Sequence, residues 1–322
     1  MGTTEVSITT TADAPFNDPT DCVDLVIRTV DNVDFFVLSG LLSLKSPSSF
    51  FRQVLQGGHH TEERDSFPIL EVKEDGETFR IILLLCYPYA PPKIKSVEQL
   101  VAVGKALDKY CMAHAWKRFV QTVITSSLIK EQALRIFARA VANGWKELGE
   151  AAAKNTLNIP LDSEVELEDL RCIDALQYVR LRDYHRRCGK AALAAMSGKQ
   201  IRMPWLKGYA SELRFLRSDL ACCRVCGRQQ QAIKVDQTLY YAHSWFFHYL
   251  ATVKTGALLR PCSEIALDDD IIFQAAMSSI SDCSPAEWTN IASEQIRQFA
   301  KLLTREVDRL ISQVTLNIEW TK

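Results

Sequence analysis

Two apolar runs near the start of the chain have the composition of β-strands. Residues 22–30 and 33–38 are rich in β-branched and aromatic side chains, and Asp31 and Asn32 separate them. This pattern predicts a β-hairpin with a tight polar turn. A third apolar run at 67–72 predicts another strand.

Helical spacing of apolar residues dominates the rest of the chain. Ser46 and Pro47 have the form of a helix start, and Gly57 ends the short helix predicted after them. Ser96 and Gln99 are spaced as a capping box. Further helices are predicted at 77–86, 96–110, 113–124, 130–142, 145–157 and 284–314.

The apolar stripe of the last predicted helix favours a core face, with a coiled-coil seam as the alternative. The whole pattern predicts an α+β fold. It divides the chain into an α/β domain at 20–125 and a mainly helical C-terminal region at 126–322.

Composition places the chain among globular proteins. Its 322 residues are 47% hydrophobic and 24% charged, which predicts a real core and two domains. No apolar run reaches about 18 residues, so we expect no membrane span. Residues 1–19 are rich in Thr, Ser and Asp and predict a disordered tail rather than a secretory signal. With ten cysteines and no such signal, we expect a reducing compartment, cytoplasmic or nuclear, and no secretion.

The order of predicted elements between Asp21 and Ile124 resembles the BTB/POZ domain. The run from Asp21 to Val26 looks like the family's first strand, 41–51 like its helical pair, and 83–88 like the end of its next helix. The helix ending Cys86-Tyr87-Pro88 and the segments 106–110 and 184–188 are similar to those of a large group of BTB-domain proteins from mushroom-forming fungi.

The resemblance implies a non-enzymatic interaction protein that forms a homodimer or docks protein partners. It also implies, as one possible use, an adaptor that recruits a cullin-based ubiquitin ligase. Two features depart from the family. BTB domains usually carry a basic residue soon after the second strand, where this chain has Val37, Leu38 and Ser39, and a short acidic cullin-binding motif is missing. The interaction face is predicted to include Val23, Leu25, Phe35, Phe36, Leu41, Leu42 and Phe51, with burial in the core as the alternative for each.

Catalytic motifs are missing from the sequence: it has no nucleophile elbow, zinc-protease helix or phosphate loop, and we expect no enzymatic activity. One metal-binding pattern stands out, a Cys-x-x-Cys at Cys223 and Cys226. Because zinc takes four ligands, His185 and Cys188, one helical turn apart, complete the predicted structural zinc site in a knuckle spanning 185–226. Cys222, Cys262 or Cys283 are alternative members, and buried free cysteines are the alternative to zinc.

Positive charge is concentrated around the same segment. Residues 180–228 contain 12 Lys or Arg against 3 Asp or Glu, although the net charge of the whole chain is −1. A solvated face paired with acidic segments such as 162–169 or 268–270 is the favoured interpretation. A nucleic-acid-associated regulator that contacts phosphate through this segment is the alternative function, although the near-neutral chain makes nucleic acid the less favoured partner.

Overall fold

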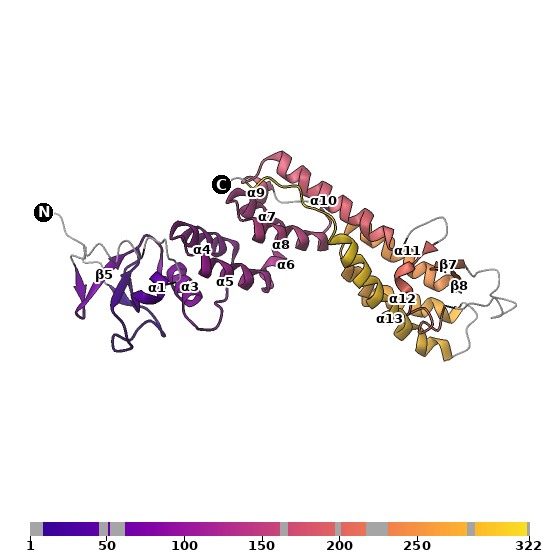
Figure 1. The fold of residues 1–322 in the computed structure, drawn as a ribbon, viewed down its shortest axis with the longest axis horizontal. Helices are drawn as coiled ribbons and strands as arrows, with labels where there is room; N and C mark the ends of the chain where they lie inside the picture. The colour runs from indigo at the N-terminus through magenta and orange to yellow at the C-terminus, as the bar shows by residue number, and fades with distance from the viewer. Residues whose placement is uncertain are drawn as a thin grey trace. The chain divides into compact units, whose positions relative to one another are not determined.

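The protein is described by a computed structural model with two compact units (Figure 1). The first extends to Ala152, and the second runs from Ala153 to Trp320. Both combine helices and strands, so the α+β class is confirmed. The structure describes residues 9–44, 51, 62–161, 167–196, 201–216, 231–281 and 287–320.

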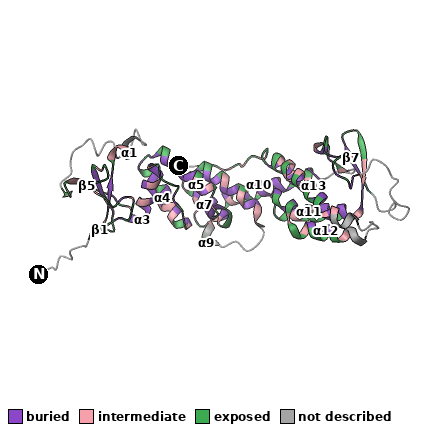
Figure 2. Ribbon diagram, turned by 90° about the horizontal axis from the view of Figure 1, so that it is seen from below, coloured by how far each residue is buried: buried purple, intermediate pink, exposed green. Residues whose placement is uncertain are grey.

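A five-stranded sheet forms one side of the first unit. Its order is β1-β3-β2-β5-β4, with β2 antiparallel to β3 and parallel to β5. The predicted hairpin is therefore confirmed, and Asn32 in its turn has a positive φ of 57°. Most residues of β2 and β3 are buried (Figure 2). The strands are β1 (Thr10–Thr11), β2 (Leu25–Arg28), β3 (Val33–Val37), β4 (Glu63–Arg64) and β5 (Phe67–Glu71).

Residues 9–19 differ from the predicted disordered tail. Strand β1 pairs in parallel with β3, and the Phe16 side chain is only 1% exposed. Its ring lies 6.2 Å from that of Phe35 and 5.2 Å from that of Tyr87, measured between centroids. One buried aromatic residue thus anchors a polar segment that composition alone classifies as disordered.

Helices cover the sheet of the first unit and continue beyond it. The predicted helix at 113–124 is confirmed as α5 with the same bounds, and Ser96 caps α4 by accepting from the backbone N–H of Gln99 at 3.2 Å. Most of the short helix predicted after Ser46 lies outside the described residues. The helices are α1 (Ser39–Leu44), α3 (Gly76–Cys86), α4 (Val97–Lys109), α5 (Ala113–Ile124), α6 (Leu128–Glu131), α7 (Ala133–Ala142) and α8 (Lys146–Asn155).

The contact between Trp145 and α4 explains why the first unit extends past residue 125, where the sequence predicted a domain boundary. The Trp145 ring occupies the space beside Gly104, where an added Cβ would lie 2.5 Å from it. Its Nε1–H donates to the Asp108 carboxylate at 2.8 Å. A glycine and a buried indole therefore tie the start of α8 to α4.

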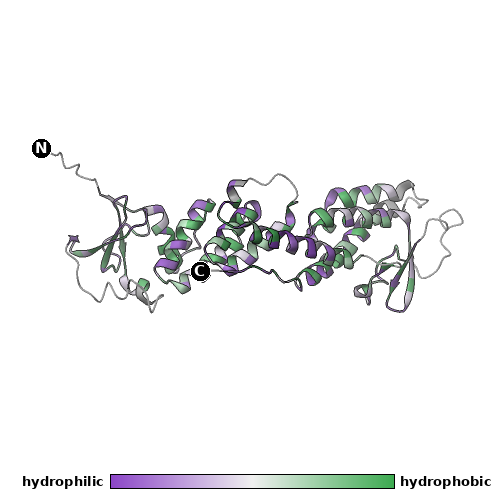
Figure 3. Cartoon of the chain, turned by 90° about the horizontal axis from the view of Figure 1, so that it is seen from above, coloured by the Kyte–Doolittle hydropathy of each residue, from purple (hydrophilic) through white to green (hydrophobic). Residues whose placement is uncertain are grey.

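The second unit has an aromatic core between its helices. Rings of Phe215, Trp245, Phe246 and Phe299 lie 4.6 to 6.3 Å from their neighbours. Hydrophobic and hydrophilic residues alternate along its helices (Figure 3). The helices are η1 (Thr156–Asn158), α9 (Leu167–Leu170), α10 (Ala175–Ala194), η2 (Pro204–Leu206), α11 (Ser244–Leu259), η4 (Ser263–Leu267), α12 (Asp269–Ser281) and α13 (Glu287–Ile311).

A three-stranded sheet in this unit was missed by the sequence prediction, which treated the region as mainly helical. Strands β6 (Ile201–Arg202), β7 (Gln231–Val235) and β8 (Thr238–Ala242) lie in that order, and β7 and β8 form a hairpin. Asp236 in its turn has a φ of 53°. The signal was hidden because β8 leads directly into the aromatic start of α11, so the two read as one apolar segment.

Candidate functional site

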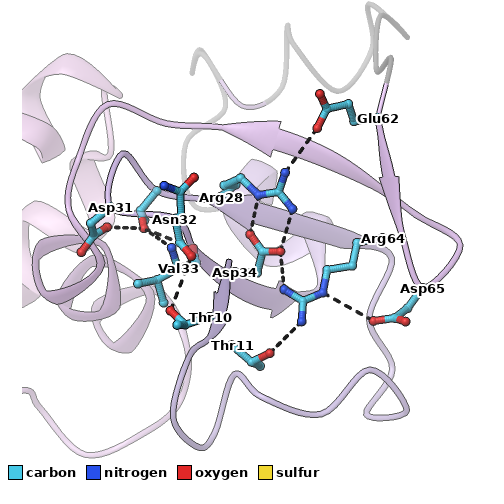
Figure 4. A network of polar contacts seen from close by, with 11 residues as sticks. Thr10, Thr11, Arg28, Asp31, Asn32, Val33, Asp34, Glu62, Arg64 and Asp65 are labelled. Carbon is cyan, nitrogen blue, oxygen red and sulfur yellow. Dashed lines mark hydrogen bonds and ion pairs between the residues drawn. The ribbon is translucent and has the colours of Figure 1, made fainter. Parts of the chain in front are cut away.

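A buried carboxylate lies at the centre of the first sheet (Figure 4). The Asp34 side chain on β3 is 0% exposed. Arg28 on β2 donates to it from Nε at 2.8 Å and from Nη2 at 2.9 Å. Arg64 on β4 donates from Nη1 at 2.5 Å. We call these three residues the Asp34 cluster; its carboxylate accepts three charge-assisted hydrogen bonds.

Arg64 links the two edges of the sheet. β1 and β4 are the first and last strands in the sheet order. Nevertheless, Nη2 of Arg64 donates to Oγ1 of Thr11 on β1 at 2.8 Å, and the guanidinium carbon lies 5.6 Å from the centroid of the Phe36 ring. The sheet is therefore curled so that its opposite edges meet at the Asp34 cluster.

The electrostatics of the cluster favour an ionised Asp34. Burial acts to raise the pKa of this carboxyl group, but the hydrogen bonds and charges of Arg28 and Arg64 outweigh burial and hold its pKa below the ordinary value of 3.8. Glu62 lies 3.2 Å from Arg28 and Asp65 lies 3.7 Å from Arg64. Since every charge has an opposite partner, the cluster is suited to holding the sheet together.

Sequence reasoning missed this cluster, although a signal was present. The predicted hairpin has its turn at Asp31 and Asn32, and this turn places Arg28 directly opposite Asp34 on the paired strand. Opposite charges at paired positions within two apolar strands indicate a buried ion pair. The participation of Arg64, thirty residues further along, had no such local signal.

Most of the predicted interaction face is buried in the first unit. Val23 and Leu41 are partly exposed, and Val23 packs against the buried cluster of Val26, Phe36 and Ile69. The Phe51 ring lies 4.9 Å from that of Tyr110. Side chains that contribute to the core, and so are not available to a partner, are Leu25, Phe35, Phe36, Leu42 and Phe51.

The two partly exposed residues lie next to a polar contact between Asp24 and Ser39. The Asp24 carboxylate accepts from the backbone N–H of Ser39 at 2.6 Å and from its hydroxyl at 2.7 Å. Leu38, between β3 and α1, is 38% exposed. We call Val23, Leu38 and Leu41 the α1 patch; the Asp24–Ser39 contact brings its segments together.

The predicted zinc site is only partly described. His185 and Cys188 lie on α10 and are both buried. Nε2 of His185 is 3.1 Å from the carbonyl oxygen of Ile159. Because a carbonyl only accepts, this nitrogen carries the proton, and Nδ1 alone has a lone pair for a metal. Burial raises the pKa of the Cys188 thiol to about 11.

Cys223 and Cys226 lie outside the described residues. Within the part of the chain that the structure describes, no group of three or more His, Cys, Asp or Glu is placed to hold a metal ion. The zinc site therefore stays a prediction.

Several basic residues between 180 and 228 form ion pairs within the second unit. Arg186 and Arg187 both donate to Asp183, at 2.5 Å and 2.8 Å. Arg180 pairs with Glu319 at 2.7 Å, and Lys207 with Asp236 at 3.0 Å. Of the acidic segments predicted as partners, residues 162–166 lie outside the described residues, so that pairing stays a prediction. Arg217, Arg224 and Arg228 lie outside the described residues.

No family model and no curated protein matches this chain. Among the described helices, none combines the length and apolar character needed to cross a membrane. The function therefore has to be inferred from the residues and their contacts.

Proposed function

We propose that the first unit is a BTB/POZ-like protein-interaction module that pairs with a second copy of the chain or docks a protein partner. The order of its elements supports this proposal. A β-hairpin is followed by α1, then by β5 and α3, and then by the helical pair α4 and α5. This is the order that the resemblance implies for a BTB/POZ domain.

The α1 patch is the surface that carries the proposal. Apolar side chains exposed together favour contact with another protein surface, because burying them removes apolar area from water. Leu38 is exposed, Val23 and Leu41 are partly exposed, and the Asp24–Ser39 contact holds their backbones in place. A second copy of the same patch would bury the leucines of both chains across a two-fold axis.

Light scattering on the full chain tests self-association. We expect the mass of a dimer at micromolar concentration, and the mass of a monomer for the double variant Leu38→Asp/Leu41→Asp. Val30→Asp is the matched control, because Val30 is exposed in the same unit but lies beside the hairpin turn. A dimer that persists in the double variant, or a wild-type monomer, would contradict pairing through this patch.

We further propose that the module serves as an adaptor for a cullin-based ubiquitin ligase, as the resemblance implies. Affinity purification of the full chain from nuclease-treated lysate, quantified by mass spectrometry, tests this use. A cullin recovered with the wild type and lost with a first-unit variant such as Leu38→Asp/Leu41→Asp supports it. Recovery of the chain with no cullin, beside a positive control adaptor that does recover one, argues against it.

A further inference from the structure

The second unit contains a pocket that the proposed function does not use. It has a volume of about 450 Å³ and opens between α10, the end of α11 and the segment after η1. All of these elements belong to the second unit. The residues that give it its chemical character are Leu161, Val179, Leu258, Arg182, Arg186 and Lys190.

Two of the three aliphatic side chains that line the pocket are exposed, and the third, Leu161, is buried. Val179 is 57% exposed and Leu258 is 60% exposed, although both line a concave surface. Large aliphatic groups left in water beside a cavity favour a ligand that has an apolar side chain of its own.

Positive charge borders the same cavity. Arg182, Arg186 and Lys190 follow one another at four-residue spacing, so they lie along one face of α10. Lys190 is exposed and forms no ion pair within the described part of the chain. The pocket therefore presents a row of cations next to aliphatic walls.

One carboxylate, Asp183, is among the described residues that line the pocket, and it does not cancel this charge. It accepts from Nη2 of Arg186 at 2.5 Å and also from Nε of Arg187 at 2.8 Å. A single negative charge is thus shared between two guanidinium groups. The described lining residues comprise three cations and one carboxylate, so this lining has a net positive charge and favours an anionic ligand.

Two contacts to backbone carbonyl groups connect the elements at the base of the pocket. Nε2 of His185 contacts the carbonyl of Ile159 at 3.1 Å, which ties α10 to the segment after η1. On the other side, Gly189 of α10 lies close to α11: a Cβ added there would be in ordinary contact, at 3.4 Å, with the carbonyl oxygen of Ala257. A pocket built on tied helices needs little rearrangement to bind a ligand.

We propose that this pocket binds an acidic linear peptide: a leucine-like side chain enters between Val179 and Leu258, and Asp or Glu residues on either side pair with the cations of α10. Successive cations at four-residue spacing are about 6 Å apart along the helix axis. Alternate residues of an extended peptide are about 6.7 Å apart. Two acids at alternate positions on one side of the leucine therefore match a neighbouring pair of cations in the row. This site is independent of the first unit and of its proposed pairing.

The aliphatic walls favour a peptide over nucleic acid. Single-stranded nucleic acid is usually held by aromatic side chains on which the bases stack. The one ring among the described lining residues is that of His185, which is buried and bound to Ile159. Leu161, Val179 and Leu258 instead offer the branched surface that a leucine side chain fills.

Fluorescence anisotropy on the full chain tests the proposal. The probe is a labelled nine-residue peptide with a central leucine and glutamates at alternate positions on both sides. We expect saturable binding that weakens about tenfold in Arg186→Gln/Lys190→Gln. The matched control is Lys301→Gln/Arg305→Gln, two exposed basic residues at the same spacing on α13, for which we expect unchanged affinity.

A second pair of variants separates the peptide from a simple polyanion. Val179→Ser/Leu258→Ser keeps every charge, and we expect it to lower the peptide affinity by at least fivefold. The proposal is overturned if the wild type does not bind the peptide, or if the serine variant binds it unchanged. It is also overturned if an oligothymidylate binds more tightly than the peptide. Melting curves verify that each variant is folded, and the single Lys190→Gln variant provides the charge test if the double variant is not.

Discussion

The two units use charged side chains in opposite ways. In the first unit, the Asp34 carboxylate is fully buried and bound by one guanidinium group from the adjacent strand β2 and one from the edge strand β4. In the second unit, Arg186 and Lys190 are exposed beside an aliphatic pocket, and the nearby Asp183 is shared between two arginines. A buried, balanced set of charges holds a fold together, whereas an exposed, unbalanced set remains available to a ligand.

The largest effect that this comparison predicts is for Asp34→Asn. An asparagine side chain has one oxygen only, so at least one of the three buried hydrogen bonds is left unmade, and the negative charge between the two guanidinium groups is lost. We expect a loss of about 3 kcal/mol in the free energy of unfolding, measured by urea denaturation. Asp236→Asn, which removes an exposed partner of Lys207, is the control and should change stability by less than about 0.5 kcal/mol. Equal losses of unfolding free energy in the two variants would show that the buried carboxylate contributes no more to stability than the exposed one.

Arg64→Met is expected to have a smaller effect. The methionine keeps an apolar stem beside Phe36 but removes the link from β4 to Asp34 and Thr11. Because Arg28 still neutralises Asp34, we expect a loss of about 1.5 kcal/mol in the same assay. Lys95→Met, which breaks an exposed ion pair with Glu77, should be close to neutral. A neutral Arg64 variant would show that the sheet is curled without this contact.

Acid should reduce the advantage of the wild type over Asp34→Asn. Since the pKa of Asp34 is depressed in the folded state, its contribution is complete above its ordinary value of 3.8 and is lost as the pH falls below that value. We therefore expect the stability difference between the two proteins to be constant from pH 7 to pH 5 and to narrow below pH 3.8. Denaturant titrations at several pH values measure it, and a difference that widens in acid would contradict the direction of the shift.

The smallest effect on stability is expected at the pocket. Arg186→Gln/Lys190→Gln removes two exposed charges, so we expect the free energy of unfolding to change by less than about 0.5 kcal/mol. The same variant is expected to lose most of its affinity for the acidic peptide. A large loss of stability would show that these cations hold the second unit together, as Arg28 and Arg64 do in the first.

Local pattern was sufficient for much of the fold. The hairpin at 22–38 and the helix at 113–124 were predicted because strand composition, turn residues and helical spacing act over a few neighbouring residues. The β7–β8 hairpin was not predicted, because the aromatic start of α11 follows its second strand almost directly and the two together look like one apolar segment. The structure of residues 9–19 was not predicted because the segment is mostly polar and only Ala12 and Phe16 in it are buried apolar residues.

Sequence alone predicted an α+β chain, the helices up to about residue 157, the last helix and the concentration of positive charge after residue 180, but not α10, α11 or α12 individually. The partners of those charges were decided in three dimensions. Arg64 meets Asp34 and Thr11 only because the sheet curls, and the α10 cations border a cavity only because α11 ends beside them. The pattern of hydrophobic and polar residues along a chain indicates which side chains are exposed to water and which are buried in the core. Which of them meet depends on contacts between residues far apart in sequence, which leave no local periodic signal.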